Sequence, residues 1–304
     1  MLKEISDKSA FAMAVILVTG ALGQLGSEIR KLSDNFHGYD FIFTDKDDLD
    51  ITSEDSVNKF ITFNKPGWVI NCAAYNLVDK AESESDIAFL VNGTSVKNLT
   101  DAIKGTGCKL IHLSTDYVFD GMANSPYNEN CETNPQSVYG RSKLAGEKYA
   151  LQHYSTMVIR TSWLYSSFCH NFVKTIIKHA KEKELLKVVF DQTGTPTYAA
   201  DLAGAILHIV SGVIRNQMAF IPGIYHYSNE GVCSWYDFAT EILHEVGIDT
   251  AILPILSADY PTPAKRPAYS VMDKSKIKET YRINIPYWRD SLVRCLKILN
   301  QKQI

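Results

Sequence analysis

Two side chains that could move a proton stand four residues apart in the segment SVYGRSK, which spans residues 137–143. If this segment is helical, the Tyr139 phenol and the Lys143 ammonium lie one turn apart on the same face. A phenol with its ordinary pKa of about 10 is a poor acid at neutral pH, and a neighbouring positive charge lowers that pKa. The pair therefore predicts a proton donor, Tyr139, whose pKa Lys143 lowers. The same spacing also occurs in many surface helices, so the rest of the chain must decide between the two interpretations.

A hydroxyl and a carboxylate come directly after a predicted strand. The run KLIHLS (109–114) has the composition and length of a buried strand, and Thr115 and Asp116 follow it. Ligands of parallel sheets bind beyond the carboxyl ends of the strands. Tyr139 begins the helix that leads into the next predicted strand, MVIRTS (157–162). We therefore expect Thr115, Asp116 and Tyr139 to lie together.

A glycine-rich turn near the start of the chain has the pattern of a dinucleotide-binding loop. The apolar run AVILVT (14–19) predicts a buried strand, and Gly20, Gly23 and Gly26 open the helix-like stretch after it. The first glycine permits a tight turn, the second lets the backbone approach a pyrophosphate, and the third lets helix and strand pack closely. The amides of the helix N-terminus then face the phosphates. This context predicts a nucleotide site.

Strands alternate with helices in the first half of the chain. Further strands are predicted at 40–44 and 68–74, and residues 79–104 are helical in character. Such alternation predicts an α/β fold, a Rossmann-like doubly wound parallel sheet covered on both faces. Asp45 ends the 40–44 strand at a spacing that suits the ribose hydroxyls of a nucleotide, although an ordinary loop aspartate would look the same.

The composition is that of an ordinary globular protein. The chain has 304 residues, 45% of them hydrophobic, and a formal net charge of −3. We expect neither a nucleic-acid partner nor a membrane one, because there is no basic excess and no apolar run of about 18 residues. The six cysteines are scattered, which favours reduced thiols and a cytoplasmic location. No spacing of cysteines or histidines is typical of a metal site.

Seven longer blocks carry a resemblance to a known family. A TGxxGxxG loop, a Thr after the fourth strand and Tyr-x-x-x-Lys are typical of extended short-chain dehydrogenase/reductases. Within that superfamily the chain resembles the dTDP-4-dehydrorhamnose reductases. The matching blocks are NCAAYNLVDKAE (71–82), STDYVFDG (114–121), VYGRSKLAGE (138–147), RTSWLY (160–165), DQTGTPT (191–197), YHYSNEGVCSWYDFA (225–239) and YPTPAKRP (260–267).

The resemblance implies reduction of the C4 keto group of a dTDP-linked 4-keto-6-deoxy sugar by NADPH or NADH, the last step to dTDP-L-rhamnose. Catalytic roles fall on Thr115, Tyr139 and Lys143. The substrate-binding residues it implies are Thr115, Asp116, Tyr139, Trp163, Lys265 and Arg266, the last two as a clamp for the diphosphate. The cofactor-binding residues are Gly20, Gly23, Gln24, Leu25, Gly26, Asp45, Asp50, Ile51, Ala73, Ala74, Tyr75, Tyr139 and Lys143. Asp45 would repel a 2′-phosphate and favours NADH, whereas the family favours NADPH or both.

The resemblance also implies a smaller, discontinuous substrate domain. We expect residues 13–165 and a return segment near 187–230 to bind the dinucleotide. Residues 166–186 and 231–304 would bind the sugar nucleotide, and residues 1–12 would be an extension. The helices predicted in this half of the chain span residues 170–182, 199–211, 234–246 and 289–299, and a strand-like run spans 187–190.

A metal is not expected. Some members of the family hold Mg²⁺ with acidic side chains at a homodimer interface, and Glu28 matches one such position. The acidic pair expected after GTPT is replaced here by Tyr198-Ala199-Ala200, which leaves Asp201 alone. A homodimer remains an expectation from the resemblance.

Dehydratase and epimerase activities, and a role without catalysis, are alternatives to the reductase activity. Related dehydratases carry Asp-Glu after the Ser or Thr, and Tyr117 stands where that Glu would be, which disfavours elimination of water. Epimerases share the catalytic residues but not the seven blocks. A non-catalytic regulatory subunit on the same fold, or a reductase of another nucleotide sugar, remains the alternative.

Overall fold

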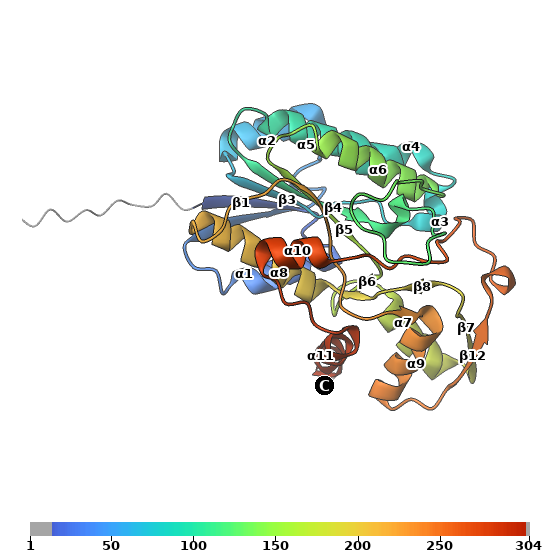
Figure 1. Ribbon diagram of the computed structural model, residues 1–304. Coiled ribbons are helices and arrows are strands. Elements are labelled where there is room, and N and C mark those ends of the chain that lie inside the picture. The colour runs from blue at the N-terminus through green and yellow to red at the C-terminus, as the bar shows by residue number, and fades with distance from the viewer. Residues whose placement is uncertain (1–13, 302–304) are drawn as a thin grey trace, which may run out of the picture.

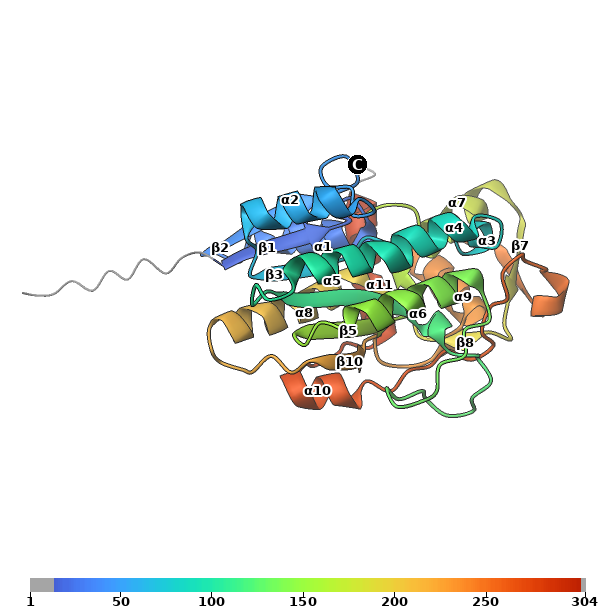
Figure 2. The ribbon, with the colours of Figure 1, turned by 90° about the horizontal axis from the view of Figure 1, so that it is seen from above.

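The computed structural model describes residues 14–301, and its centre is a sheet of six parallel strands. The order across the sheet is β2-β1-β3-β4-β5-β10 (Figures 1 and 2). The chain leaves β1 toward β2 and returns to β3 on the other side of β1, and such a reversal is where open parallel sheets bind ligands. The strands are β1 (Ala14–Thr19), β2 (Tyr39–Thr44), β3 (Trp68–Asn71), β4 (Lys109–Thr115), β5 (Thr156–Thr161) and β10 (Gly223–His226).

Helices cover both faces of the sheet, which confirms the predicted fold class. Side chains alternate along β1, so Ile16 and Val18 pack toward α1 and α8 while Leu17 packs toward α2 and α5. Figure 2 shows α2, α5 and α6 side by side over the sheet. The helix bounds are α1 (Gln24–Ser33), α2 (Glu54–Asn64), α5 (Ser95–Ile103), α6 (Val138–Ala150) and α8 (Ala199–Ile214). The sixth strand, β10, was not predicted because it is a four-residue strand at the edge of the sheet.

The helical character predicted for residues 79–104 is confirmed, but the helix is interrupted. The structure divides it into α3 (Val78–Ala81), α4 (Ser85–Phe89), a π-helical turn (Leu90–Thr94) and α5. The π-helical turn carries Asn92, whose side chain is buried and bonded to other segments. Such wide turns often occur at functional sites, and apolar periodicity alone does not reveal them.

A smaller packing unit lies beside the end of the sheet (Figure 1). Its core joins β7 (Leu185–Val189) and β12 (Ala251–Ile255), which pair in parallel, with three helices. These are α7 (Phe172–Glu182), α9 (Trp235–Val246) and α11 (Trp288–Gln301). Two short pairs adjoin the unit, β6 (Leu164–Tyr165) with β9 (Thr197–Tyr198) and β8 (Thr193–Gly194) with β11 (Cys233–Ser234).

Two segments pack in a different unit from the one that the sequence led us to expect. β7 packs in the smaller unit, although the return segment was expected to begin near residue 187. Helix α10 (Ser275–Tyr281) packs against the large sheet through Ile277 and Tyr281, although it lies within 231–304. Apolar contacts across the sheet, which the sequence pattern does not specify, decide both placements. The extension expected at residues 1–12 lies outside the described residues.

None of the helices within residues 14–301 is long and apolar enough to cross a membrane.

Candidate active site

The glycine loop is built by close backbone contacts. Gly20 has φ +65°, and a Cβ at this position would stand 2.6 Å from the Ala73 amide nitrogen. A Cβ on Gly26 would stand 2.4 Å from the Gly20 carbonyl oxygen. Gly23 is the extended N-cap residue of α1. The loop after β1 and the loop after β3 therefore touch at the point where the strand order reverses.

Carboxylates border this loop. Asp45 follows β2, and its Oδ2 accepts a hydrogen bond from the Leu22 amide at 3.0 Å. Asp50 Oδ1 accepts from the Thr52 hydroxyl at 2.6 Å and from the Thr52 amide, and these bonds lower the pKa of Asp50. The residues present fit a dinucleotide: glycines where side chains cannot stand, a helix N-terminus, and a carboxylate held at the end of β2.

Three other residues predicted to bind the cofactor make contacts within the protein. The Ile51 side chain is buried, and its carbonyl accepts from Asn98 at 3.1 Å. Leu25 belongs to the core beneath the sheet, so its side chain packs inward. Gln24 donates to the Leu164 carbonyl at 3.3 Å, which ties the start of α1 to β6.

Asn71, at the end of β3, organises the loop that follows. Its Oδ1 accepts from the Thr19 hydroxyl at 2.7 Å and from the Ala73 amide at 3.2 Å. Its Nδ2 lies 3.1 Å from His112 Nδ1. Burial, and then the charge of Lys143, lower the pKa of His112 well below its ordinary value. This histidine is therefore neutral and structural at physiological pH.

Asn92 fixes the next stretch of the same loop. Its Oδ1 accepts from the Tyr75 amide at 2.8 Å, and its Nδ2 donates to the Tyr75 carbonyl and to Ser142 on α6. Ala74 and Tyr75 are thus held beside the helix that carries the catalytic candidates. The Tyr75 hydroxyl donates a hydrogen bond to Glu84.

Thr115 and Tyr139 meet at the carboxyl end of β4. Ser137 caps α6 by accepting from the Gly140 amide, and Tyr139 is placed in the first turn. The Thr115 hydroxyl lies beside the Tyr139 phenol and favours its ionised form. The phenol donates to Asn76 Oδ1 at 3.3 Å. The predicted juxtaposition of Thr115 and Tyr139 is present.

The expected direction of the Tyr139 pKa is wrong. Burial raises the pKa of Tyr139 above its ordinary value, and the neighbouring Thr115 hydroxyl offsets only part of that rise. The Lys143 ammonium instead donates to the Leu113 carbonyl at 2.6 Å. Burial lowers the pKa of Lys143 to about 8, against the opposing charge of Glu147. Helical spacing correctly predicts that the two side chains share a face, but not which acceptor the lysine finds.

A buried ion pair supports this face of the site. Arg160 on β5 binds Glu147 on α6 through Nε (2.9 Å) and Nη2 (2.7 Å), and both side chains are almost fully buried. Ser114 also donates to Glu147. The pair ties α6 to the two strands that flank the catalytic residues.

Asp116 is buried rather than open to a substrate. Only 2% of its surface is exposed, and its Oδ1 accepts from the Thr115 hydroxyl at 2.9 Å. Burial raises its pKa to about 6, although hydrogen bonds from Thr115 and Ser270 favour the charged form. Asp116 therefore contacts Thr115 from within the protein interior.

The remaining substrate candidates come from the smaller unit and its edge. Trp163, with φ +47°, stacks on Trp235 of α9 with ring centroids 3.6 Å apart. Arg266 forms a bidentate pair with Asp79 of α3. Lys265 is exposed.

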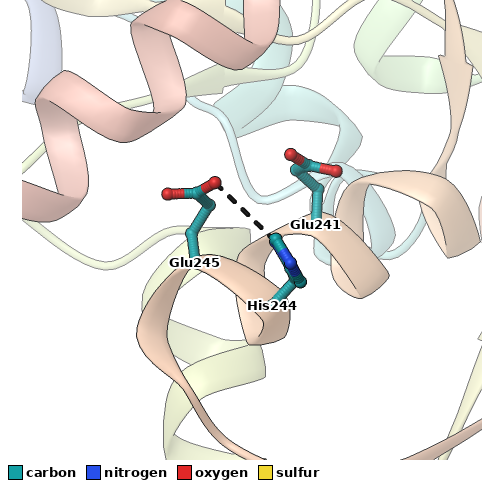
Figure 3. A group of neighbouring side chains, drawn as sticks. All are labelled: Glu241, His244 and Glu245. Atoms are coloured by element: carbon teal, nitrogen blue, oxygen red, sulfur yellow. Dashed lines mark ion pairs between the residues drawn. The ribbon is translucent and has the colours of Figure 1, made fainter.

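The acidic candidates for a metal are engaged in other contacts. Glu28 is buried and accepts from the Ser166 hydroxyl at 2.6 Å. Figure 3 shows Glu241, His244 and Glu245 gathered on α9, with His244 paired to Glu245. Glu241 also faces Arg289 at 3.4 Å. We assign no role in the site to this exposed group.

Sequence reasoning missed the amides that arrange the site. Asn71, Asn76 and Asn92 each bind a loop or a catalytic side chain, and none was predicted. Asn71 and Asn76 lie in the block NCAAYNLVDKAE directly after a predicted strand, and that position was a usable signal. Asn92 gave no such signal, because it lies within a helical stretch.

Comparisons with known proteins cover nearly the whole chain. The family model described as RmlD substrate binding domain matches residues 13–301. The chain is 41% identical over 282 residues to the spore coat polysaccharide biosynthesis protein SpsK of Bacillus subtilis, covering 92% of this chain and 96% of that protein. It is 40% identical over 287 residues to the dTDP-4-dehydrorhamnose reductase of Aggregatibacter actinomycetemcomitans, covering 92% and 97%.

A solved structure agrees with the fold. The dTDP-4-dehydrorhamnose reductase of Bacillus anthracis, in complex with NADP, superposes with a TM-score of 0.89 at 36% identity. The match covers 94% of this chain and 99% of that one. The chain therefore belongs to the dTDP-4-dehydrorhamnose reductase family, whose model is described as RmlD substrate binding domain.

Proposed function

We propose that this protein reduces the C4 keto group of dTDP-4-dehydro-6-deoxy-L-mannose to dTDP-L-rhamnose, using NADPH or NADH. The observation that carries the proposal is the buried Tyr139 phenol beside the Thr115 hydroxyl at the carboxyl end of β4. The family membership and the NADP complex of the Bacillus anthracis relative support the same conclusion.

Proton delivery falls to Tyr139. A reduced nicotinamide supplies the hydride that adds to the carbonyl carbon, and the carbonyl oxygen then needs one proton. The phenol is protonated at neutral pH, as a general acid must be. Because burial raises its pKa, it releases the proton only as negative charge develops on the carbonyl oxygen. Thr115 donates to Asp116 in the structure, so its hydroxyl hydrogen must turn to hold the substrate oxygen.

The residues that would hold the cofactor are those of the glycine loop with Asp45, Ala73, Ala74 and Lys143. Asp45 already faces the loop amide of Leu22, and its negative charge favours a free 2′-hydroxyl over a 2′-phosphate. Comparing kcat/KM for NADH and NADPH measures this preference, and Asp45→Ala is expected to shift the ratio toward NADPH.

The decisive experiment is turnover by the purified protein. We expect NADPH or NADH oxidation to depend on the dTDP-4-keto sugar and to exceed that with UDP- or GDP-linked analogues. Tyr139→Phe is expected to lower kcat by about 10²–10⁴-fold, because it removes the proton donor, with nearly unchanged cofactor affinity. Absence of turnover with tight binding of another protein would favour the regulatory-subunit alternative.

Three organisational proposals accompany the reaction. We take the large sheet as the cofactor-binding domain and the smaller unit as the sugar-nucleotide domain. Trp163 and Arg266, which lie between them, would then face the substrate. A homodimer and a cytoplasmic location are proposed from the family resemblance, and sedimentation of the purified protein tests the dimer.

A further inference from the structure

An extended segment, residues 264–273, runs beside the active site and joins the two packing units. We call it the strap. The Ser270 amide donates to the Thr193 carbonyl at 2.8 Å, and the Tyr269 amide donates to the Gly121 carbonyl at 3.2 Å. The Ser270 side chain also stabilises the charged form of Asp116, next to Thr115. A group carried by the strap therefore has a fixed place relative to the catalytic residues.

Arg266 leaves the strap and meets Asp79 of α3 end-on. Its Nη1 donates to Asp79 Oδ1 at 3.0 Å, and its Nη2 donates to Oδ2 at 2.8 Å. The Ala264 amide donates to the same Oδ1 at 3.2 Å, and Nη1 also reaches the Ala264 carbonyl at 3.4 Å. Hydrogen bonds from Arg266 are the main cause of the lowered pKa of Asp79. These contacts fix both the position and the plane of the guanidinium.

Part of the guanidinium remains available. It carries five N–H donors, of which Nη1 uses two and Nη2 uses one in the contacts above. Among residues 14–301, no protein acceptor is recorded for Nε or for the second Nη2 hydrogen. These two hydrogens point the same way and form a fork that matches two oxygens of a phosphate. The side chain keeps 26% of its surface exposed, so a ligand can reach the fork.

Tyr117 links Arg266 to the proton donor. Arg266 interacts electrostatically with the Tyr117 hydroxyl, and the Tyr117 ring packs edge-on against Tyr139 with centroids 5.5 Å apart. In a nucleotide sugar the diphosphate is attached at C1 of the hexose, and the proposed reacting carbonyl is at C4. One sugar ring therefore separates the diphosphate from the reacting carbonyl of the ligand.

We propose that Asp79 is a positioning residue that holds Arg266 so that its remaining fork receives the diphosphate of the nucleotide sugar. The choice of ligand rests on the proposed function, but the role of Asp79 rests on the contacts above. A free arginine would lose much rotational freedom on binding a phosphate, whereas this one is already oriented. The negative charge of Asp79 opposes the ligand, but solvent screens it because 40% of its side chain is exposed.

The test is dTDP binding by calorimetry to the full chain and to three variants, Asp79→Asn, Arg266→Gln and the double variant. We expect Asp79→Asn to weaken dTDP binding about tenfold and to raise the KM of the sugar substrate far more than it changes kcat. We expect no further loss when Asp79→Asn is added to Arg266→Gln, because Asp79 acts through Arg266. NADPH affinity should stay the same in all variants.

A matched control is Asp101→Asn, which removes an exposed carboxylate paired with Lys97 on α5. It should leave dTDP binding unchanged. Unchanged or tighter dTDP binding by Asp79→Asn would overturn the proposal, as would an equal further loss in the Arg266→Gln background. If the wild-type chain shows no turnover but binds dTDP through Asp79 and Arg266, the proposed function fails while this inference stands.

Discussion

At the scale of single residues, Asp116 shows how a group next to the chemistry is set by its surroundings. Its carboxylate is buried and accepts a hydrogen bond from the Thr115 hydroxyl. Burial raises its pKa from 3.8 to about 6, because the low-dielectric interior disfavours the charged form. The hydrogen-bond direction of Thr115 is therefore coupled to the protonation of Asp116.

The raised pKa predicts a specific dependence of stability on pH. The folded protein holds the Asp116 proton more tightly than the unfolded chain, so this group stabilises the fold below about pH 3.8. That stabilisation is lost as the pH rises through about 6. Between pH 4 and 7 we expect wild type to lose stability relative to Asp116→Asn by up to roughly 3 kcal/mol. Urea unfolding of both proteins across this range measures the difference, and parallel curves would contradict the prediction.

At the scale of elements, two helical glycines differ in the space that an added side chain would find. Gly26 lies in α1, where an added Cβ would stand 2.4 Å from the Gly20 carbonyl oxygen and 2.6 Å from Ala21 Cα. Both contacts are with backbone, which cannot move without separating α1 from β1. Gly204 lies inside α8, and an added Cβ there would meet no atom within 4 Å.

We expect Gly26→Ala to destabilise the fold by about 1–3 kcal/mol, as overpacking does in other cores. NADPH binding should weaken as well, because the loop amides shift. Gly204→Ala is the matched control, and it should stabilise the fold by about 0.5–1 kcal/mol, because alanine favours the helix. Thermal unfolding and NADPH fluorescence titration measure both effects. Equal stability and equal NADPH affinity of the two variants would show that the close backbone contact at Gly26 does not limit the residue at that position.

At the scale of the whole molecule, the active site depends on how the two packing units meet. Trp163 comes from the chain that leaves the large sheet, and it stacks on Trp235 of the smaller unit at 3.6 Å between ring centroids. The Phe172 ring also packs against Trp235, with ring centroids 4.5 Å apart. This aromatic group fixes Trp163 in a backbone conformation with φ +47°, which is strained for a tryptophan.

Removing the stack should affect the substrate but not the cofactor. We expect Trp235→Ala to raise the KM of the dTDP sugar severalfold and to lower the midpoint of thermal unfolding, because Trp163 loses its partner. NADPH affinity should not change, since the glycine loop lies on the other unit. Trp235→Phe keeps a stacking ring and should retain most of the wild-type KM. A parallel loss of NADPH affinity in Trp235→Ala would show instead that the two units do not bind their ligands separately.

The sequence alone determined the doubly wound sheet, the glycine loop and the pairing of Thr115 with Tyr139. These depend on local patterns: apolar runs of strand length, glycines at turns and residues placed at strand ends. Only the tertiary structure decided the acceptor of Lys143, the burial of Asp116 and the pair between Arg266 and Asp79. Each of these depends on which groups from distant segments meet, and on how much water remains between them, and sequence spacing specifies neither.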